Sequence, residues 1–190
     1  MTFSLEHIIQ QCLNGERAGQ KALYEAYKDI LYPICLRYTK QEEEAEDVFI
    51  EAFHKILTKI DAYKGEGSFE GWMKKIMVNE SLMFLRKRNR LHLMVELHDT
   101  DIPDIPEYEG DFDFEQILEV LKELPDGYRA VFNLYVLEGY KHKEIAEILN
   151  ISINTSKSQL ILAKKRMIEQ LKKKDKFPFQ NINPKSPTKL

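Results

Sequence analysis

The sequence predicts an all-α protein in which two small helical domains are joined by a flexible acidic linker. Apolar residues recur at helical spacing through residues 4–90, and a helix-turn-helix pattern lies between Tyr140 and Met167. Between these parts, the segment from Leu91 to Glu115 holds nine acidic residues and no Lys or Arg. A chain of 190 residues, 43% hydrophobic and 31% charged, is long enough for two small cores.

Breaks in this pattern divide the chain into four segments. We expect a helical domain at 1–90, an acidic linker at 91–111, a second helical domain at 112–172 and a basic, disordered tail at 173–190. Pro103, Pro106 and the weak periodicity around them predict that the linker is extended and mobile when nothing is bound to it.

Composition excludes several classes of protein. No apolar run approaches the ~20 residues that span a bilayer, and the N-terminal segment lacks the pattern of a signal peptide, so we expect a cytoplasmic protein. Cys12 and Cys35 are far apart and predict buried free thiols rather than a disulfide scaffold or a zinc cluster. The five histidines follow no metal-ligand or catalytic-triad spacing, so we expect no catalytic residues, no metal and no cofactor.

Charge is segregated along the chain, although the net charge is only −3. From Ile153 to Leu190 there are ten basic residues against Glu169 and Asp175. A cationic end of this kind favours contact with nucleic acid phosphates, and a soluble disordered end is the alternative for its last part.

In the first domain, Gly15 and Gly19 flank an expected gap between helices, and Pro33 marks an expected restart. The segment from Glu42 to Ile60 predicts an amphipathic helix with acidic residues at its start and lysines near its end. Its apolar stripe comprises Ala45, Val48, Phe49, Ala52, Phe53, Ile56, Leu57 and Ile60.

Ile50 lies off this stripe, beside Glu46, Asp47 and Glu51. An exposed apolar residue in an acidic rim is typical of a partner-binding face. The alternative is a second buried edge of a helix that is nearly surrounded by protein.

A loop at 61–71 leads into an expected helix at 69–90 that ends in a basic run including Arg86, Lys87, Arg88 and Arg90. Tyr63, Phe69 and Trp72 lie near the loop, and aromatic rings beside cations suit single-stranded DNA, whose bases stack while its phosphates pair with Lys and Arg. Alternatively, Trp72, Ile76 and Leu82 or Met83, at helical spacing, belong to the core, and the cations only complement the helix dipole.

In the second domain, the helix start and stop signals predict helices at about 112–123 and 126–137, followed by the helix-turn-helix. Ile145, Ala146 and Leu149 share one face of its first helix, and Ser152 is an expected N-cap of its second helix. The expected buried stripe of that second helix is Ile153, Ser156, Leu160, Ala163 and Met167, and the opposite face carries Asn154, Lys157, Ser158, Ile161 and Lys165. This geometry suits a recognition helix in the DNA major groove, with a helical hairpin in a core as the alternative.

Five strings, taken in order, resemble regions 2.1, 2.2, 2.3 to 2.4, 4.1 and 4.2 of the extracytoplasmic-function sigma factors, the minimal two-domain members of the sigma-70 family. They are LYEAYKDILYPICLRYT, EEAEDVFIEAFHKI, GSFEGWMKKIMVNESLMFLRKRNR, ELPDGYRAVFNLYVLEGYKHKEIAEILNIS and NTSKSQLILAKKRM. The resemblance implies a subunit that docks on core RNA polymerase, reads a promoter at its −10 and −35 elements and starts transcription.

The resemblance also implies residue roles in the first domain. Glu46, Asp47, Glu51 and Phe53 match the helix that seats on the clamp helices of the largest polymerase subunit, and Ile50 stands where the family commonly has Gln. The segment from Lys64 through Ser68 to Phe69 matches the loop that captures a flipped base of the −10 element, and Asn79 matches the helix lining that site. Arg86, Lys87, Arg88 and Arg90 would hold the phosphates nearby.

In the second domain, the family pattern Thr-Val-Lys-Ser-Arg-Leu corresponds to Thr155 through Leu160, where Lys157 and Ser158 agree. Gln159 and Leu162 stand where the family often has basic residues. Major-groove readout would therefore lean on Asn154, Lys157, Ser158 and Gln159, and Ile161 or Leu162 would meet thymine methyl groups. The implied −35 contacts are Asn154, Thr155, Lys157, Ser158, Gln159, Ile161, Leu162 and Lys165.

The implied partners are core RNA polymerase, also contacted at its flap region through region 4, promoter DNA and an anti-sigma factor, which could tether the protein to a membrane. The acidic linker would occupy the cationic polymerase cleft, or serve only as a repulsive spacer. A stand-alone helix-turn-helix regulator is the alternative function, and a helical adaptor that touches no DNA is a third.

Overall fold

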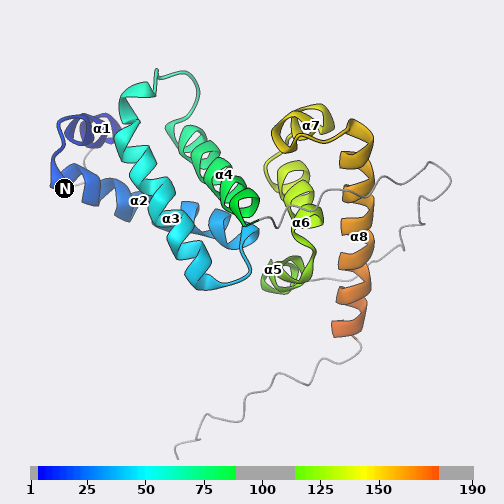
Figure 1. The fold of residues 1–190 in the computed structure, drawn as a ribbon. Helices are drawn as coiled ribbons and strands as arrows, with labels where there is room; N and C mark the ends of the chain where they lie inside the picture. Colours follow the sequence, from blue (N-terminus) through cyan, green and yellow to red (C-terminus); the bar gives the residue numbers. More distant parts are fainter. Residues whose placement is uncertain (1–3, 89–113, 176–190) are drawn as a thin grey trace, which may run out of the picture.

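The computed structural model describes residues 4–88 and 114–175, and within these ranges every regular element is a helix (Figure 1). The predicted all-α class is confirmed. The linker expected at 91–111 and residues 176–190 of the expected tail lie outside the described residues.

The helices of the N-terminal body pack against one another (Figure 1), and their buried apolar residues belong to one cluster that also includes residues of the C-terminal body. Its elements are α1 (Leu5–Leu13), α2 (Arg17–Tyr38), α3 (Glu42–Thr58), a 3-10 turn η1 (Ile60–Ala62) and α4 (Phe69–Lys87). Leu23 on α2, Ile56 on α3 and Met77 on α4 are fully buried where these helices meet. The apolar stripe predicted for 42–60 is confirmed, with every member buried except the half-buried Leu57.

The expected gap between the first two helices is present between Leu13 and Arg17, although Gly19 already lies inside α2. The restart expected at Pro33 was wrong, because α2 runs through this residue without interruption. Pro33 lacks an N–H donor and usually costs a helix interior about 3 kcal/mol. Burial of Leu31, Ile34 and Cys35 on either side of it offsets that cost, because each buried aliphatic side chain contributes about 1.5–3 kcal/mol. Tertiary packing therefore overrides the local signal.

Gly19 marks the closest approach of α1 to α2. A Cβ atom at this position would lie 2.4 Å from Cβ of Gln11 and 3.1 Å from the backbone nitrogen of Cys12. Neither atom is the free end of a flexible side chain, so a methyl group would push α1 away from α2. Glycine is required here by packing rather than by a turn.

We expect Gly19→Ala to lower the free energy of unfolding by about 1–3 kcal/mol, the usual cost of overpacking. Helix propensity alone predicts the opposite, because Ala is favoured over Gly in a helix interior by about 1 kcal/mol. Urea denaturation measures the change. Ala26→Gly, at an exposed position of the same helix, is the control and should cost only the propensity difference. A more stable Gly19→Ala protein would contradict the close approach.

The C-terminal body is built on the long last helix. Its elements are α5 (Phe114–Glu123), α6 (Asp126–Phe132), a π-helical turn η3 (Asn133–Leu137), α7 (His142–Leu149) and α8 (Ile153–Asp175). α8 packs against α5, α6 and α7, and Ala163 is fully buried among them (Figure 1). The expected helix at 126–137 is present, but its second half is π-helical. α8 extends three residues past the expected domain boundary at 172.

The turn between α7 and α8 forms as the sequence predicted. Asn150 adopts a left-handed backbone (φ 55°), which an Asn tolerates and which ends α7 sharply. The Ser152 hydroxyl accepts a hydrogen bond from the backbone N–H of Thr155 at 2.9 Å, so the predicted N-cap is confirmed. Ile153 was wrongly placed in the buried stripe: it is 44% exposed, because the side of this first turn that packs against the protein is the one that carries Thr155 and Ser156, 4% and 0% exposed.

Candidate functional site

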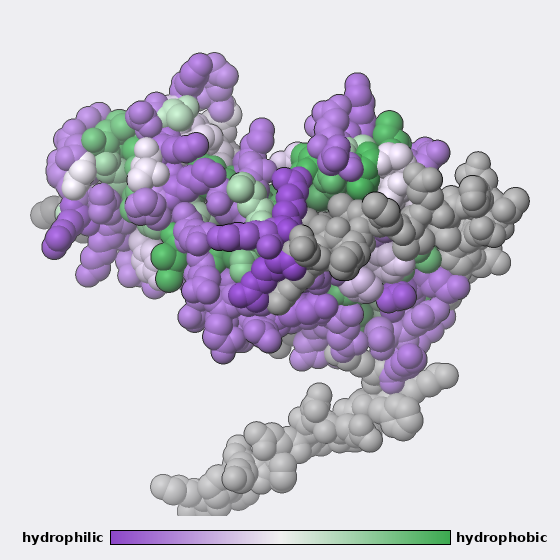
Figure 2. Space-filling model, viewed as in Figure 1, coloured by the Kyte–Doolittle hydropathy of each residue, from purple (hydrophilic) through white to green (hydrophobic). Residues whose placement is uncertain are grey.

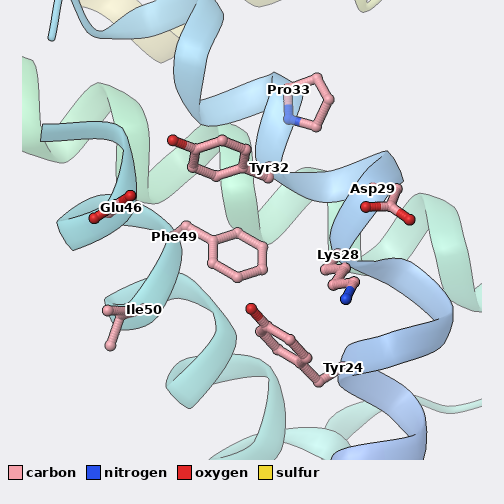
Figure 3. Close-up of a pocket in the computed structure, with 8 residues that line it drawn as sticks. All are labelled: Tyr24, Lys28, Asp29, Tyr32, Pro33, Glu46, Phe49 and Ile50. Atoms are coloured by element: carbon pink, nitrogen blue, oxygen red, sulfur yellow. The ribbon is translucent and has the colours of Figure 1, made fainter. Parts of the chain in front are cut away.

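A cavity of about 460 Å³ opens between α2 and α3 (Figure 3). The ring of Phe49 points from α3 toward α2 and lies edge-on to Tyr24 and Tyr32, with centroid distances of 5.9 and 5.7 Å (Figure 3). The lining residues are Tyr24, Lys28, Asp29, Tyr32, Pro33, Glu46, Phe49 and Ile50. The site is thus an aromatic hollow with charged groups at its edge.

Ile50 stands at the rim of this cavity and is 65% exposed. The predicted exposure of Ile50 is confirmed, and the alternative of a second buried edge is wrong. Glu46, Asp47 and Glu51 are also exposed around it, whereas Phe53 is buried and packs its ring against Tyr24 at 5.4 Å. Phe53 therefore supports the cavity wall, and the acids and Ile50 form the outward surface.

Burial raises the pKa of the Tyr32 hydroxyl, and the nearby Glu46 and Glu42 carboxylates raise it further. The phenol consequently stays protonated and can donate a hydrogen bond at the cavity. Together, the site offers an apolar floor, a hydroxyl donor and an acidic rim. That combination suits a partner surface with an apolar side chain flanked by cations.

The loop before α4 is held by an aromatic cluster. Phe69 stacks on Trp72 at 5.5 Å and lies edge-on to Tyr63 at 5.0 Å. Phe69 is 3% exposed and so belongs to the core, while Tyr63 and Trp72 are half-buried. Of the residues that the alternative placed in the core, Leu82 is buried, Ile76 is half-buried and Met83 is 54% exposed. The Tyr63 hydroxyl donates to the carbonyl of Gly67 at 2.9 Å and fixes the loop.

The other predicted residues around this loop remain accessible. Lys64 and Asn79 are exposed, and the exposed Ser68 uses its hydroxyl to cap α4 through the backbone N–H of Gly71 at 3.0 Å. A base entering here would therefore meet Lys64, Asn79 and the half-buried Tyr63 and Trp72 rather than the buried Phe69.

The basic end of α4 is partly engaged within the protein. Arg86 donates to the backbone carbonyl of Ile148 in α7, and Arg88 pairs with Glu44 at 2.9 Å. Lys87 is exposed. Arg90 lies outside the described residues.

In the helix-turn-helix, His142 ties α7 to its neighbours. Its ring stacks on Tyr135 at 4.5 Å, and Nδ1 lies 2.9 Å from the hydroxyl of Ser156 on α8. Burial lowers the pKa of His142, and the positive charges of Lys157 and Lys164 lower it further, so the ring is neutral near pH 7.

The predicted contact residues of α8 fall into three groups. Asn154 and Lys157 are exposed, while Ile161, Leu162 and Lys165 are half-buried. Thr155, Ser158 and Gln159 are buried, with 4%, 5% and 0% of their surface exposed. Asn154 and Lys157 are therefore the predicted residues that α8 presents most openly.

Two family models match the chain: sigma-70 region 2 over residues 23–91 and sigma-70 region 4 over residues 114–167. The chain belongs to the sigma-70 family, in its extracytoplasmic-function group. The resemblance read from the sequence is confirmed, and the surfaces described above fall in the two matched regions.

Relatives extend over most of this sigma factor. The RNA polymerase sigma factor SigV of Bacillus subtilis is 31% identical over 150 residues, covering 78% of this chain and 89% of the relative. The ECF RNA polymerase sigma factor SigW of the same organism is 27% identical over 186 residues, covering 90% and 99%.

A solved structure shares the fold: the sigma factor RpoE in complex with the anti-sigma factor NepR, from Bartonella quintana. The TM-score is 0.52 at 23% identity, over 80% of this chain and 96% of that one.

Sequence reasoning missed two groups of residues in this sigma factor. Tyr24 and Tyr32 line the cavity, and their spacing of eight on one helix could have marked a shared face. The second group contains Arg37, Arg129 and Glu138, which meet at the boundary between regions 2 and 4. Within the described residues, no helix is long and apolar enough to cross a membrane, and no cluster of potential metal ligands is found.

Proposed function

We propose that this sigma factor binds core RNA polymerase, recognises promoter −35 and −10 elements and directs the initiation of transcription. The observation that carries the proposal is that both sigma-70 regions match in order on one chain, and each has an exposed surface of suitable chemistry. It is an initiation factor and not an enzyme. A stand-alone regulator explains region 4 but not region 2.

Core polymerase is assigned to the α2–α3 surface. Ile50 with Phe49 supplies the apolar contact, and Glu46, Asp47 and Glu51 supply the acidic rim. Phe53 packs its ring against Tyr24 in the cavity wall. The clamp helices of the largest subunit are the proposed partner here, and the flap region is the proposed partner of region 4.

The −10 element is assigned to the loop and C-terminal end of α4. Lys64, Asn79 and Lys87 are exposed there, and the half-buried Tyr63 and Trp72 are the aromatic residues proposed to contact an unstacked base. Ser68 and Phe69 shape the loop. Arg86, Arg88 and Arg90 complete the proposed phosphate contacts.

The −35 element is assigned to the start of α8. Asn154 and Lys157 are the leading contacts, with Ile161, Leu162 and Lys165 next along the helix. Thr155, Ser158 and Gln159 stay in the proposed set as secondary contacts, because they are buried in the free chain. The neutral His142 stabilises the turn that presents these residues.

An anti-sigma factor is the proposed regulator. The fold neighbour from Bartonella quintana was solved with the anti-sigma factor NepR, and we extend that mode of control to this chain. Because polymerase and promoter DNA are its proposed partners, the protein works in the cytoplasm at the nucleoid.

Run-off transcription with purified core polymerase tests the function, using DNA upstream of this chain's own gene. We expect a discrete transcript that requires the protein. A variant with Arg86, Lys87, Arg88 and Lys157 changed to alanine should lose it at physiological salt and regain part of it at low salt. A plot of log affinity against log salt concentration has a negative slope, and each lost phosphate contact makes that slope less steep by roughly 0.9.

The control changes Arg17, Lys21, Lys59 and Arg166 to alanine, which removes two Arg and two Lys that are exposed and outside the proposed contacts. It should transcribe like the wild type. Salt-sensitive binding to the same DNA without polymerase, and no transcript with it, would favour the stand-alone regulator instead.

A further inference from the structure

The open side of α4 carries an apolar stripe that runs on past the loop. Trp72, Ile76 and Met83 are separated by four and by seven residues, so they lie in line on the side of the helix opposite the buried Ser81 and Leu85. Trp72 and Ile76 are half-buried, whereas Met83 is 54% exposed. The stripe therefore ends in an open methionine that no assigned contact uses.

The charges around Met83 indicate what kind of partner this side of α4 meets. A single exposed apolar side chain is common and by itself identifies no partner, and Figure 2 shows small hydrophobic areas set among hydrophilic residues on the N-terminal body. Lys75 and Lys87 are exposed, and with Met83 they share a row of residues four apart. Glu80 is neutralised by an ion pair with Lys55, and its side chain is only 14% exposed. The open side is thus cationic, which is complementary to the phosphates of DNA.

Asn79 fixes where along the DNA Met83 would lie. It is exposed, stands one turn before Met83 in the same row, and belongs to the proposed −10 surface. A helix rises about 1.5 Å per residue, so the two residues are about 6 Å apart along the axis of α4. A DNA strand advances about 3.4 Å per nucleotide, so this distance corresponds to about two nucleotides. The C-terminal end of α4 leads toward region 4, whose −35 target lies upstream, so Met83 lies on the upstream side of Asn79.

We propose that Met83 selects thymine at a promoter position about two nucleotides upstream of the base at Asn79, by packing its side chain against the 5-methyl group. This proposal rests on the proposed function, in which α4 contacts the −10 element. Thymine is the base that presents a methyl group in the major groove, and apolar side chains contact it there. The unbranched, polarizable side chain of Met adapts its shape to such a group. Met83 thereby adds base selection to a surface whose cations hold phosphates.

Run-off transcription with core polymerase on a set of barcoded templates tests the position. In the DNA upstream of this chain's own gene, each base pair is changed in turn to every other base pair, and the transcripts are counted. We expect Asn79→Ala to abolish the base preference at one position, and Met83→Gln to abolish a preference for thymine about two positions upstream of it. Gln keeps the helix propensity of Met, so the unfolding midpoint should not change.

Deoxyuridine in place of that thymine tests the chemistry, because it removes only the methyl group. We expect the wild-type transcript to fall about fourfold, the effect of losing one buried methyl group, and the Met83→Gln transcript to stay the same on both templates. Leu13→Gln is the matched control, since it changes an aliphatic side chain on α1 that is 45% exposed. This control should respond to deoxyuridine as the wild type does.

Three results would overturn the assignment of Met83. Equal wild-type transcription from thymine and deoxyuridine templates would exclude the methyl contact and leave the proposed function intact. A Met83→Gln protein that lowers every transcript by the same factor would place Met83 against polymerase rather than against a base. If the wild type gives no transcript from any template, the proposed function fails, and the assignment of Met83 fails with it.

Discussion

Replacing Arg129 by Met is expected to lower the free energy of unfolding by about 3 kcal/mol, the low end for breaking a buried ion pair. Arg129 is fully buried and donates to the carbonyls of Lys122 and Tyr38 as well as to Asp126. Met fills a similar volume, so the loss reports the removed donors rather than a cavity. Asp126, only 8% exposed, would keep its 3.3 Å pairing with the more exposed Lys40.

Urea denaturation of the full chain, followed by circular dichroism, measures this loss. Arg166→Met is the control, because Arg166 is exposed and lies over the ring of Tyr128 at 5.0 Å. Such an exposed cation–π contact contributes about 0.5–1 kcal/mol. Equal effects of the two substitutions would show that the buried network does not stabilise the fold beyond a surface contact.

Replacing Ile50 by Asp is expected to weaken binding to core polymerase by about 30-fold or more, which corresponds to the roughly 2 kcal/mol of an interface hot spot. Ile50 is the exposed apolar residue at the rim of the α2–α3 cavity, and a carboxylate would need desolvation against the partner. Since its side chain is 65% exposed in the free chain, the unfolding midpoint should hardly change.

Fluorescence anisotropy with labelled protein and purified core polymerase gives the affinities. Leu13→Asp is the matched control: Leu13 is also an exposed aliphatic residue, 45% accessible, but it lies on α1 away from the cavity. It should bind core like the wild type. Unchanged affinity of Ile50→Asp would remove the cavity rim from the proposed polymerase surface.

The sequence alone determined the features that depend on local spacing and local hydrogen bonds. The apolar stripe from Ala45 in α3 to Ile60 in η1 and the exposure of Ile50 follow from helical periodicity. The cap at Ser152 and the sharp turn at Asn150 follow from side chains that bond to, or tolerate, their own backbone. Each of these interactions involves residues only a few positions apart, so the local sequence is enough to predict it.

Only the tertiary structure decided the features that depend on what a helix packs against. Pro33 carries the local signal of a break, yet α2 continues through it because neighbouring helices bury its faces. Gly19 looked like the flank of a turn, but it lies inside α2, where α1 leaves no room for a Cβ atom. Phe69 looked available for a base but fills the core.

The boundary between regions 2 and 4 is the clearest case. Arg37 and Glu138 are 101 positions apart in sequence but 2.6 Å apart in space. Their contact depends on the π-helical turn that aims Asn133 and Glu138 at one helix end, and no local propensity specifies that meeting. Helical periodicity, caps and turns thus determined the helices and their exposed faces. Packing between distant segments determined which charged groups are paired and which stay accessible.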